Sequence, residues 1–337
     1  MKTLIIAEAG VNHNGSLEMA FQMIEAAAKS GADIVKFQTF RAEDLVTATA
    51  QKAQYQKEND GDSSQFEMLK KLELSEQDYQ RIMEKCQEEN IGFMSTPFSQ
   101  SAVDLLQSTG MKLWKIPSGE ITNLPLLRKI AKVGDTIVMS TGMATLEEVR
   151  QAMTVLLQSG ALREKIHLMH CTTAYPTPIE DVNLKAINVL KTLDPAGVGY
   201  SDHTTDLMVP AIAVAMGASM IEKHFTLDRN LPGPDHKASL LPDEFAQMVK
   251  NIRKVEKALG KEEKRPVGVE IPNISVARKS IVAARIINKG DFFTEDNLTC
   301  KRPGTGVSPM NWDLLLGRKS KHDYATDEEI QPDELQD

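Results

Sequence analysis

Two lysines end short apolar runs of the sequence and indicate a binding site for an anion. Lys36 lies in VKFQ and Lys115 lies in WKIPSGE. Burying an ammonium group in apolar surroundings is costly unless an opposite charge accompanies it. Two such groups in one site favour a small ligand that carries both a phosphate and a carboxylate. Ser118, Ser140 and Ser201 follow similar runs, and their hydroxyl groups can donate the remaining hydrogen bonds.

Two histidines, His203 in SDH and His224 in EKH, predict a site for a divalent metal ion. If they end neighbouring parallel strands, those ends lie about 5 Å apart, and both imidazoles can reach one ion. A single histidine is more often a hydrogen-bonding group of the core, but the pair favours a metal. Two protein ligands leave coordination positions open for a substrate.

Two other residues have functional and plain interpretations. Cys171 follows His170 and would be a candidate nucleophile, but a small buried apolar residue explains it better, so we assign it no chemistry. Asp235 lies in the segment LPGPDHKAS, where its carboxylate could hold sugar hydroxyl groups or act as a base. Without the other candidates, Asp235 would be an ordinary turn residue.

These polar residues follow apolar runs that alternate with amphipathic segments, which is the pattern of repeated βα units. Eight runs read as strands: 3–8, 33–37, 91–95, 112–116, 136–140, 166–170, 197–201 and 219–222. Eight parallel strands with intervening helices predict a (β/α)₈ TIM barrel, the active site of which lies at the carboxyl ends of the strands. The candidate residues stand at those ends.

The segments around the strands complete the predicted organisation. After Ser16, apolar residues recur at helical spacing until Gly31. Residues 40–75 are too long for an ordinary βα loop and predict an insertion at the catalytic rim. A helix near Pro242–Leu259 closes the barrel domain, 1–262, and a charged linker, 263–276, leads to a small β-rich domain, 277–337, in which INKGDFFTEDNL is faintly echoed by YATDEEIQPDEL.

The composition excludes several classes of protein. Apolar residues make up 41% of the 337 residues and charged residues 26%, which is typical of a globular protein with a sizeable core. The net charge of −8 argues against general binding to nucleic acid or to an anionic membrane. The first apolar run is too short for a signal peptide or a membrane span. Three widely separated cysteines favour a reducing cytoplasm.

Ten motifs together resemble the bacterial sialic acid synthase family. They are EAGVNHNG, VKFQTF, STPF, WKIPSGE, MSTGM, HCTTAYPTP, GYSDHT, EKHFTLD, GPDH and KRPG, and they extend over nearly the whole chain. The resemblance implies a TIM barrel followed by an antifreeze-like module, or SAF domain, and a domain-swapped homodimer. It also implies condensation of phosphoenolpyruvate with an acylated amino sugar, with a divalent ion, usually Mn²⁺ although Mg²⁺ or Co²⁺ also suits, on His203 and His224.

The same resemblance gives roles to individual residues. Those that match phosphoenolpyruvate-binding positions are Lys36, Ser95 to Pro97 with Thr96 among them, Lys115, Ser118, Ser140, Tyr175 and Ser201. Gln38, Tyr175 and Asp235 match positions that face the sugar, and Glu8 and Glu120 become the acid–base carboxylates, with Tyr175 as a further catalytic residue. Arg302, in KRPG, matches an arginine that the partner chain places on the N-acyl group of the sugar.

The sugar and the reaction class keep alternatives at this point. N-acetylmannosamine, giving N-acetylneuraminate, is our first expectation, and 2,4-diacetamido-2,4,6-trideoxymannose, giving N,N'-diacetyllegionaminate, is the alternative. Thr173, where some members of the family carry Asn, leaves this choice open. A metal-dependent aldolase that uses pyruvate is a rival enzyme. A carbohydrate-binding or ice-binding protein without catalysis is the remaining reading, and the charged C-terminal module disfavours it.

Overall fold

The computed structural model describes residues 2–52 and 64–336. The chain divides into two compact units, Met1–Gly260 and Lys261–Asp337. The first unit contains the predicted barrel, and the second contains the predicted β-rich module. Residues 53–63, which belong to the predicted insertion, lie outside the described residues.

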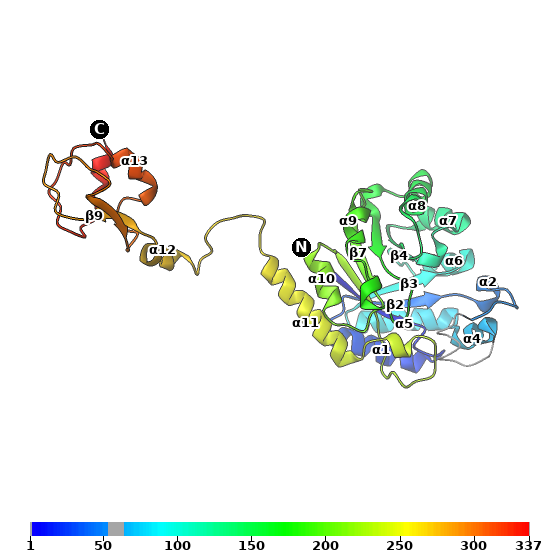
Figure 1. Ribbon diagram of the computed structural model, residues 1–337. Coiled ribbons are helices and arrows are strands. Elements are labelled where there is room, and N and C mark those ends of the chain that lie inside the picture. Colours follow the sequence, from blue (N-terminus) through cyan, green and yellow to red (C-terminus); the bar gives the residue numbers. More distant parts are fainter. Residues whose placement is uncertain (1, 53–63, 337) are drawn as a thin grey trace. The chain divides into compact units, whose positions relative to one another are not determined.

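Eight parallel strands of the first unit close into a barrel in chain order, which confirms the predicted fold class (Figure 1). The strands are β1 (Leu4–Gly10), β2 (Ile34–Thr39), β3 (Gly92–Pro97), β4 (Leu113–Ile116), β5 (Thr136–Ser140), β6 (Ile166–His170), β7 (Gly197–Asp202) and β8 (Met220–His224). Each one lies within two residues of the predicted run at either end. β1 pairs with β8, and this pairing closes the ring.

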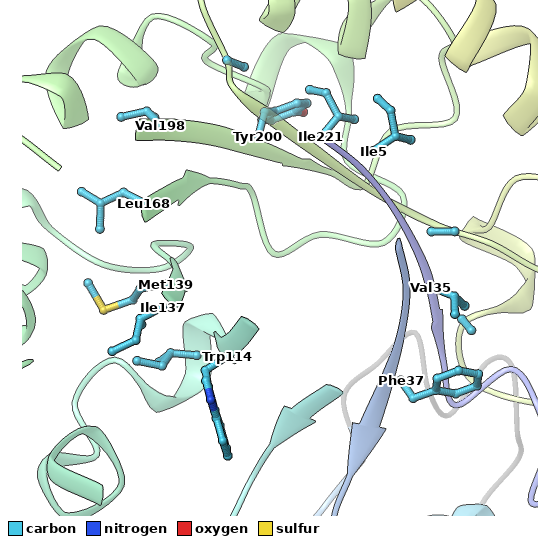
Figure 2. Packing of buried hydrophobic residues seen from close by; sticks show 14 of the residues in the cluster. Ile5, Val35, Phe37, Trp114, Ile137, Met139, Leu168, Val198, Tyr200 and Ile221 are labelled. Atoms are coloured by element: carbon cyan, nitrogen blue, oxygen red, sulfur yellow. The ribbon is translucent and has the colours of Figure 1, made fainter. Parts of the chain in front are cut away.

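The side chains of the strands alternate between two environments. In β1, Ile5 belongs to the large cluster between strands and helices, whereas Ile6 belongs to a small cluster with Met94, Val138 and Met169. Figure 2 shows the outer set from several strands, including Trp114, Leu168, Tyr200 and Ile221. Because successive side chains of a strand point to opposite faces, alternate residues must face the barrel interior. The interior therefore has an apolar layer below the polar residues of the strand ends.

Helices surround the barrel and cover its outer face (Figure 1). They are α1 (Leu17–Lys29), α5 (Glu76–Glu88), α6 (Gln100–Ser108), α7 (Leu124–Val133), α8 (Leu146–Gln158), α9 (Ala186–Lys191), α10 (Val209–Ala215) and α11 (Pro242–Leu259). Ser16 caps α1 as predicted, because its side chain accepts a hydrogen bond from the backbone of Met19. Capping boxes at Ser75 and Thr145 begin α5 and α8 in the same way.

In its described residues, the segment between β2 and α5 contains the helices α2 (Ala42–Leu45) and α4 (Gln65–Leu72). Met68, Leu69 and Leu72 of α4 are buried against Val11 and Phe40, in a cluster separate from the barrel core. The predicted insertion is therefore partly helical, with an apolar face of its own.

The second unit is a small β-containing module, as predicted. Strands β9 (Ser280–Ala283) and β10 (Leu298–Lys301) pair in antiparallel fashion, and Phe293, Leu315 and Tyr324 belong to the core beside them. The module also contains the short helix α13 (Trp312–Leu315). The two segments of the faint sequence echo meet at their first residues, because Ile287 and Tyr324 exchange backbone hydrogen bonds of 3.0 and 2.8 Å.

A helix that the sequence analysis did not anticipate occupies the end of the predicted linker, 263–276, and extends one residue beyond it. This helix is α12 (Ile271–Ala277), and Pro272 lies in its first turn, where a missing N–H costs little. None of the helices in the described part of the chain is long and apolar enough to cross a membrane.

Candidate active site

A cavity of about 480 Å³ lies among the residues at the carboxyl ends of the strands. Nearly all the predicted site residues of the first unit line it: Glu8, Lys36, Gln38, Thr96, Lys115, Ser118, Ser140, Tyr175, Ser201, His203, His224 and Asp235. They come from different strands and their following loops. The closed barrel brings them together because all eight strands end at the same edge.

The floor of the cavity, Glu8, Lys36, Lys115 and Glu222, is a buried set of alternating charges. Lys36 Nζ lies 2.9 Å from Glu8 Oε2 and 3.6 Å from Glu222 Oε1. Lys115 Nζ lies 2.7 Å from Glu222 Oε2. Each of the four residues is at most 5% exposed. Glu222 thus bridges the two lysines, while Glu8 pairs with Lys36 alone.

Hydroxyl and amide groups connect this floor to the neighbouring strands. Lys36 Nζ donates to Thr96 Oγ1 at 3.1 Å, and Ser201 Oγ donates to Glu222 Oε1 at 3.1 Å. Gln38 Nε2 donates to Glu8 Oε1 at 3.1 Å. The ammonium groups are therefore held in fixed positions, as a site for a charged ligand requires.

The two carboxyl groups of the floor differ in protonation. Burial raises the pKa of Glu8 to about 7, against the attraction of Lys36. Burial would also raise the pKa of Glu222, but Lys115 and Lys36 outweigh it and hold that pKa well below the ordinary value. Burial lowers the pKa of Lys115, against the attraction of Glu222, whereas Glu222 and Glu8 outweigh burial and raise the pKa of Lys36. The two lysines suit an anion, and the raised pKa of Glu8 allows its carboxyl group to exchange a proton.

The two predicted metal ligands lie side by side. The ring centroids of His203 and His224 are 5.5 Å apart, and both side chains are buried. The ring centroid of Tyr175 lies 4.2 Å from that of His203 and 5.6 Å from that of His224, and the second pair of rings has an edge-to-face arrangement. Burial lowers the pKa of His203 to about 4 and that of His224 well below its ordinary value. Both imidazoles are therefore neutral near pH 7.

This pair fits a divalent ion. His203 Nδ1 donates to the carbonyl of Thr172 at 2.6 Å, so Nε2 is the acceptor nitrogen, the usual arrangement of a metal-binding histidine. In this structure Nε2 lies 3.5 Å from Ser201 Oγ. The buried Nδ1 atom of His224 has no hydrogen-bond partner among the described residues. No group of three or more His, Cys, Asp or Glu side chains in 2–52 and 64–336 is arranged around a metal position. The remaining ligands would therefore have to come from other side chains, water or substrate.

Ser118 lines another part of the cavity, and Gly142 contacts its side chain. The backbone N–H of Gly142 donates to Ser118 Oγ at 2.9 Å, and Ser118 Oγ lies 3.2 Å from Cys171 Sγ. A Cβ atom at Gly142 would lie 2.7 Å from Thr173 Cγ2 and 2.9 Å from both Ser118 Oγ and Cys171 Sγ. Only glycine fits this approach of three strand-end loops.

Residues behind the histidines fix the ends of β7 and β8. Lys223 Nζ pairs with Asp202 Oδ2 at 2.5 Å, and both side chains are fully buried outside the barrel interior. Asp202 also accepts hydrogen bonds from Tyr200 and Thr204. Because Asp202 precedes His203 and Lys223 precedes His224, the ion pair holds the two histidines beside each other.

Three predicted site residues have distinct placements. Asp235 is 9% exposed in the loop after β8, and burial raises its pKa to about 6. Glu120 lies in the short turn η1 (Ser118–Glu120), where it accepts a hydrogen bond from Asn123 at 2.5 Å, and it does not line the cavity. Its placement gives no support to the acid–base role expected for it. Arg302 is in the second unit, where its Nε donates to the carbonyl of Ala277 at 3.0 Å.

The sequence analysis missed two parts of the site. Glu222 was seen only as the end of the eighth strand, although its spacing of two from His224 places both side chains on the inner face of β8. The second part consists of apolar residues of the β2–α5 segment, which line the same cavity. No signal in the sequence marked these residues as lining.

The fold and the buried site define a barrel enzyme with a floor of paired lysines and glutamates and a histidine pair. Residues 23–264 match the NeuB family, and residues 278–336 match the SAF domain. The first match covers more than half of the 337-residue chain, and the chain belongs to the NeuB family of phosphoenolpyruvate-dependent synthases.

Individual relatives narrow the comparison. The chain is 51% identical to the N,N'-diacetyllegionaminic acid synthase of Campylobacter jejuni, over 98% of this chain and 99% of that one. It is 47% identical to the synthase of the same name from Legionella pneumophila, over 95% and 90%. A crystal structure of the N-acetylneuraminic acid (sialic acid) synthetase of Leptospira borgpetersenii in complex with citrate is 33% identical, covers 81% of this chain and 90% of that one, and has a TM-score of 0.72. These comparisons favour the alternative sugar over our first expectation, N-acetylmannosamine.

Proposed function

We propose that the protein is an N,N'-diacetyllegionaminate synthase. It would condense phosphoenolpyruvate with 2,4-diacetamido-2,4,6-trideoxymannose and water, and release phosphate. The observation that carries this proposal is the buried floor with its two lysines beside the histidine pair, in a chain that matches two N,N'-diacetyllegionaminic acid synthases over at least 95% of its length. The 33% identity to the N-acetylneuraminic acid synthetase is much lower and makes N-acetylneuraminate synthesis the second candidate.

Three of the four floor residues have a part in the proposed reaction, and Glu222 holds the two lysines in place. Lys36 and Lys115, with Thr96, Ser118, Ser140 and Ser201, hold the phosphate and carboxylate of phosphoenolpyruvate. Carbon C3 of phosphoenolpyruvate bonds to the aldehyde carbon of the sugar, and water adds to C2. The C2–O bond to phosphate then breaks, and the new carbonyl forms. Glu8, with its pKa of about 7, can take up and return the protons that these steps require.

We propose that His203 and His224 hold a divalent ion, with Mn²⁺ first and Mg²⁺ or Co²⁺ as alternatives. When bound, the ion polarises the aldehyde of the sugar. Gln38, Tyr175 and Asp235 line the cavity near the histidines and Glu8, and are assigned to the sugar. Their carboxylate, amide and hydroxyl groups suit the hydroxyl groups of a carbohydrate.

We also propose a domain-swapped homodimer in which Arg302 of one chain contacts the sugar bound to the other. The SAF match and the exposed apolar residues Ile286, Phe292, Met310 and Leu314 of the second unit support an interface for this unit. Sedimentation velocity should give twice the 37.3 kDa mass of one chain. The three free cysteines are consistent with the cytoplasmic location that we propose.

The proposed function is tested by measuring inorganic phosphate release by the purified protein with Mn²⁺, phosphoenolpyruvate and each sugar. We expect fastest turnover with 2,4-diacetamido-2,4,6-trideoxymannose and loss of turnover after treatment with EDTA. Pyruvate in place of phosphoenolpyruvate should give no product. Equal use of pyruvate would instead identify a metal-dependent aldolase, and sugar binding without turnover would identify a carbohydrate-binding protein.

A further inference from the structure

Part of the cavity surface is apolar and comes from outside the barrel strands. Leu45 and Val46 at the end of α2, and Met68, Leu69 and Leu72 of α4, line the same cavity as the charged floor. We call these five residues the apolar wall. None of them takes part in the proposed bond-forming steps, and their chemistry differs from that of every floor residue.

The apolar wall is firmly attached to its surroundings. Met68, Leu69 and Leu72 are between 2 and 8% exposed and pack with Val11 and Phe40. A capping box at Ser64 begins α4. The wall therefore presents a preformed apolar surface to a ligand, since its residues are already packed.

Polar contacts also join α4 to α2, the two helices that carry the apolar wall. The Glu73 carboxylate accepts a hydrogen bond from the backbone N–H of Ala42 at 2.7 Å, and Lys70 pairs with Glu43 at 2.8 Å. Both contacts span the interval between the helices. They keep Leu45 and Val46 on the same side of the cavity as α4.

We propose that the apolar wall selects the sugar, by receiving the C6 methyl group and the acetyl methyl group at C4 of a 2,4-diacetamido-2,4,6-trideoxy sugar. This inference rests on the proposed function and assigns residues to its specificity. N-acetylmannosamine carries hydroxyl groups at both C4 and C6. A hydroxyl group placed against leucine, methionine and valine side chains loses its hydrogen bonds to water without replacement.

The size of the expected selectivity follows from the nature of the wall. An apolar surface rejects a ligand that carries an added hydroxyl group by up to about 100-fold. Changes confined to the wall should therefore alter the ratio of kcat/KM for the two sugars within this range. They should leave the KM for phosphoenolpyruvate unchanged, because the charged floor holds that substrate.

Two pairs of variants test the proposal. Val46→Thr places a hydroxyl group in the wall at nearly constant volume, and Val133→Thr makes the same change at a partly buried position of α7 outside the cavity. Leu69→Gln makes the wall polar, whereas Leu69→Met keeps it apolar at similar volume. Steady-state kinetics with both sugars would be measured for each variant, after circular dichroism and thermal unfolding have established that it is folded.

We expect Val46→Thr and Leu69→Gln to reduce the preference for the trideoxy sugar by about tenfold, and Val133→Thr and Leu69→Met to retain it. Equal losses for both sugars, or an unchanged ratio, would overturn the proposal. Calorimetric binding of the two sugars to the same variants separates this inference from the proposed function. If the wild-type chain released no phosphate with either sugar, the proposed function would fail, while the binding preference would still decide the role of the wall.

Discussion

The charged floor and the apolar wall line one cavity but have different origins. The floor stands on β1, β2, β4 and β8, where the period of two along each strand places polar side chains inside the barrel. The wall stands on the segment inserted between β2 and α5. In the function that we propose, the barrel therefore supplies the groups for the chemistry, and the insertion supplies the surface that selects the sugar.

The two regions also differ in what holds them in place. The floor buries four ionisable groups, and such groups are tolerated only because each one is paired. The wall removes apolar surface from water and so contributes to the stability of its own small cluster. Changes in the floor should mainly affect catalysis, whereas changes in the wall should affect selectivity and local stability together.

The largest expected effect is that of Lys115→Met, which removes one of the two ammonium groups of the floor. We expect kcat/KM for phosphoenolpyruvate to fall by about 10²–10³-fold, as after loss of one electrostatic donor in other active sites. Lys112→Met is the matched control, because Lys112 is exposed and directly precedes the first residue of β4, at the end of the strand away from the cavity. Steady-state phosphate release gives both values. A loss that is equal in the two variants would contradict the role of the floor.

The second prediction concerns the histidine pair beside the floor. His224→Ala should weaken Mn²⁺ binding by more than about 100-fold, since loss of a ligand exceeds the 10–100-fold effect of losing a residue that only orients one. Titration calorimetry with Mn²⁺ alone measures this without any turnover. The matched control is His167→Ala, because His167 lies at the amino end of β6, away from the cavity at the carboxyl ends of the strands. Unchanged Mn²⁺ affinity in His224→Ala would contradict the proposal that this histidine pair binds the ion.

The contrast between floor and wall also decides how much could be predicted from sequence. The barrel and the floor lysines were predictable, because eight apolar runs each ended in polar residues and a barrel brings such ends together. Glu222 could have been found from its spacing to His224. The wall could not, because Met68, Leu69 and Leu72 have the ordinary spacing of a helix that packs on a core. Glu120 was assigned from its motif, yet its turn keeps it off the cavity lining.

Asp235 tests whether a buried carboxylate without a paired cation among the described residues destabilises the folded protein. Burial alone raises its pKa from 3.8 to about 6, so the folded protein binds a proton here more tightly than the unfolded chain does. The contribution of Asp235 to the free energy of unfolding should therefore be largest below about pH 4. It should fall by about 2–3 kcal/mol as the pH rises through 6. Asp235→Asn should remove that loss.

The expected outcome for Asp235→Asn is a free energy of unfolding about 2–3 kcal/mol above that of the wild type at pH 7.5, with no difference near pH 4. Denaturant unfolding at several pH values measures it. The same variant should bind the sugar less well if Asp235 holds its hydroxyl groups. A pH-independent difference between the two proteins would show that the carboxyl group is not destabilised by burial.

The smallest expected effect is that of Arg302→Ala. This variant tests whether Arg302 of the partner chain contacts the sugar in addition to the apolar wall. If Arg302 of the partner chain donates to the N-acyl group, the KM for the sugar should rise about tenfold, as expected for one hydrogen bond from a charged group. The KM for phosphoenolpyruvate should not change. Arg285→Ala, another exposed arginine of the same unit, is the matched control. If both KM values rise equally, Arg302 acts through folding or assembly, and sugar contacts are then confined to the barrel and its insertion.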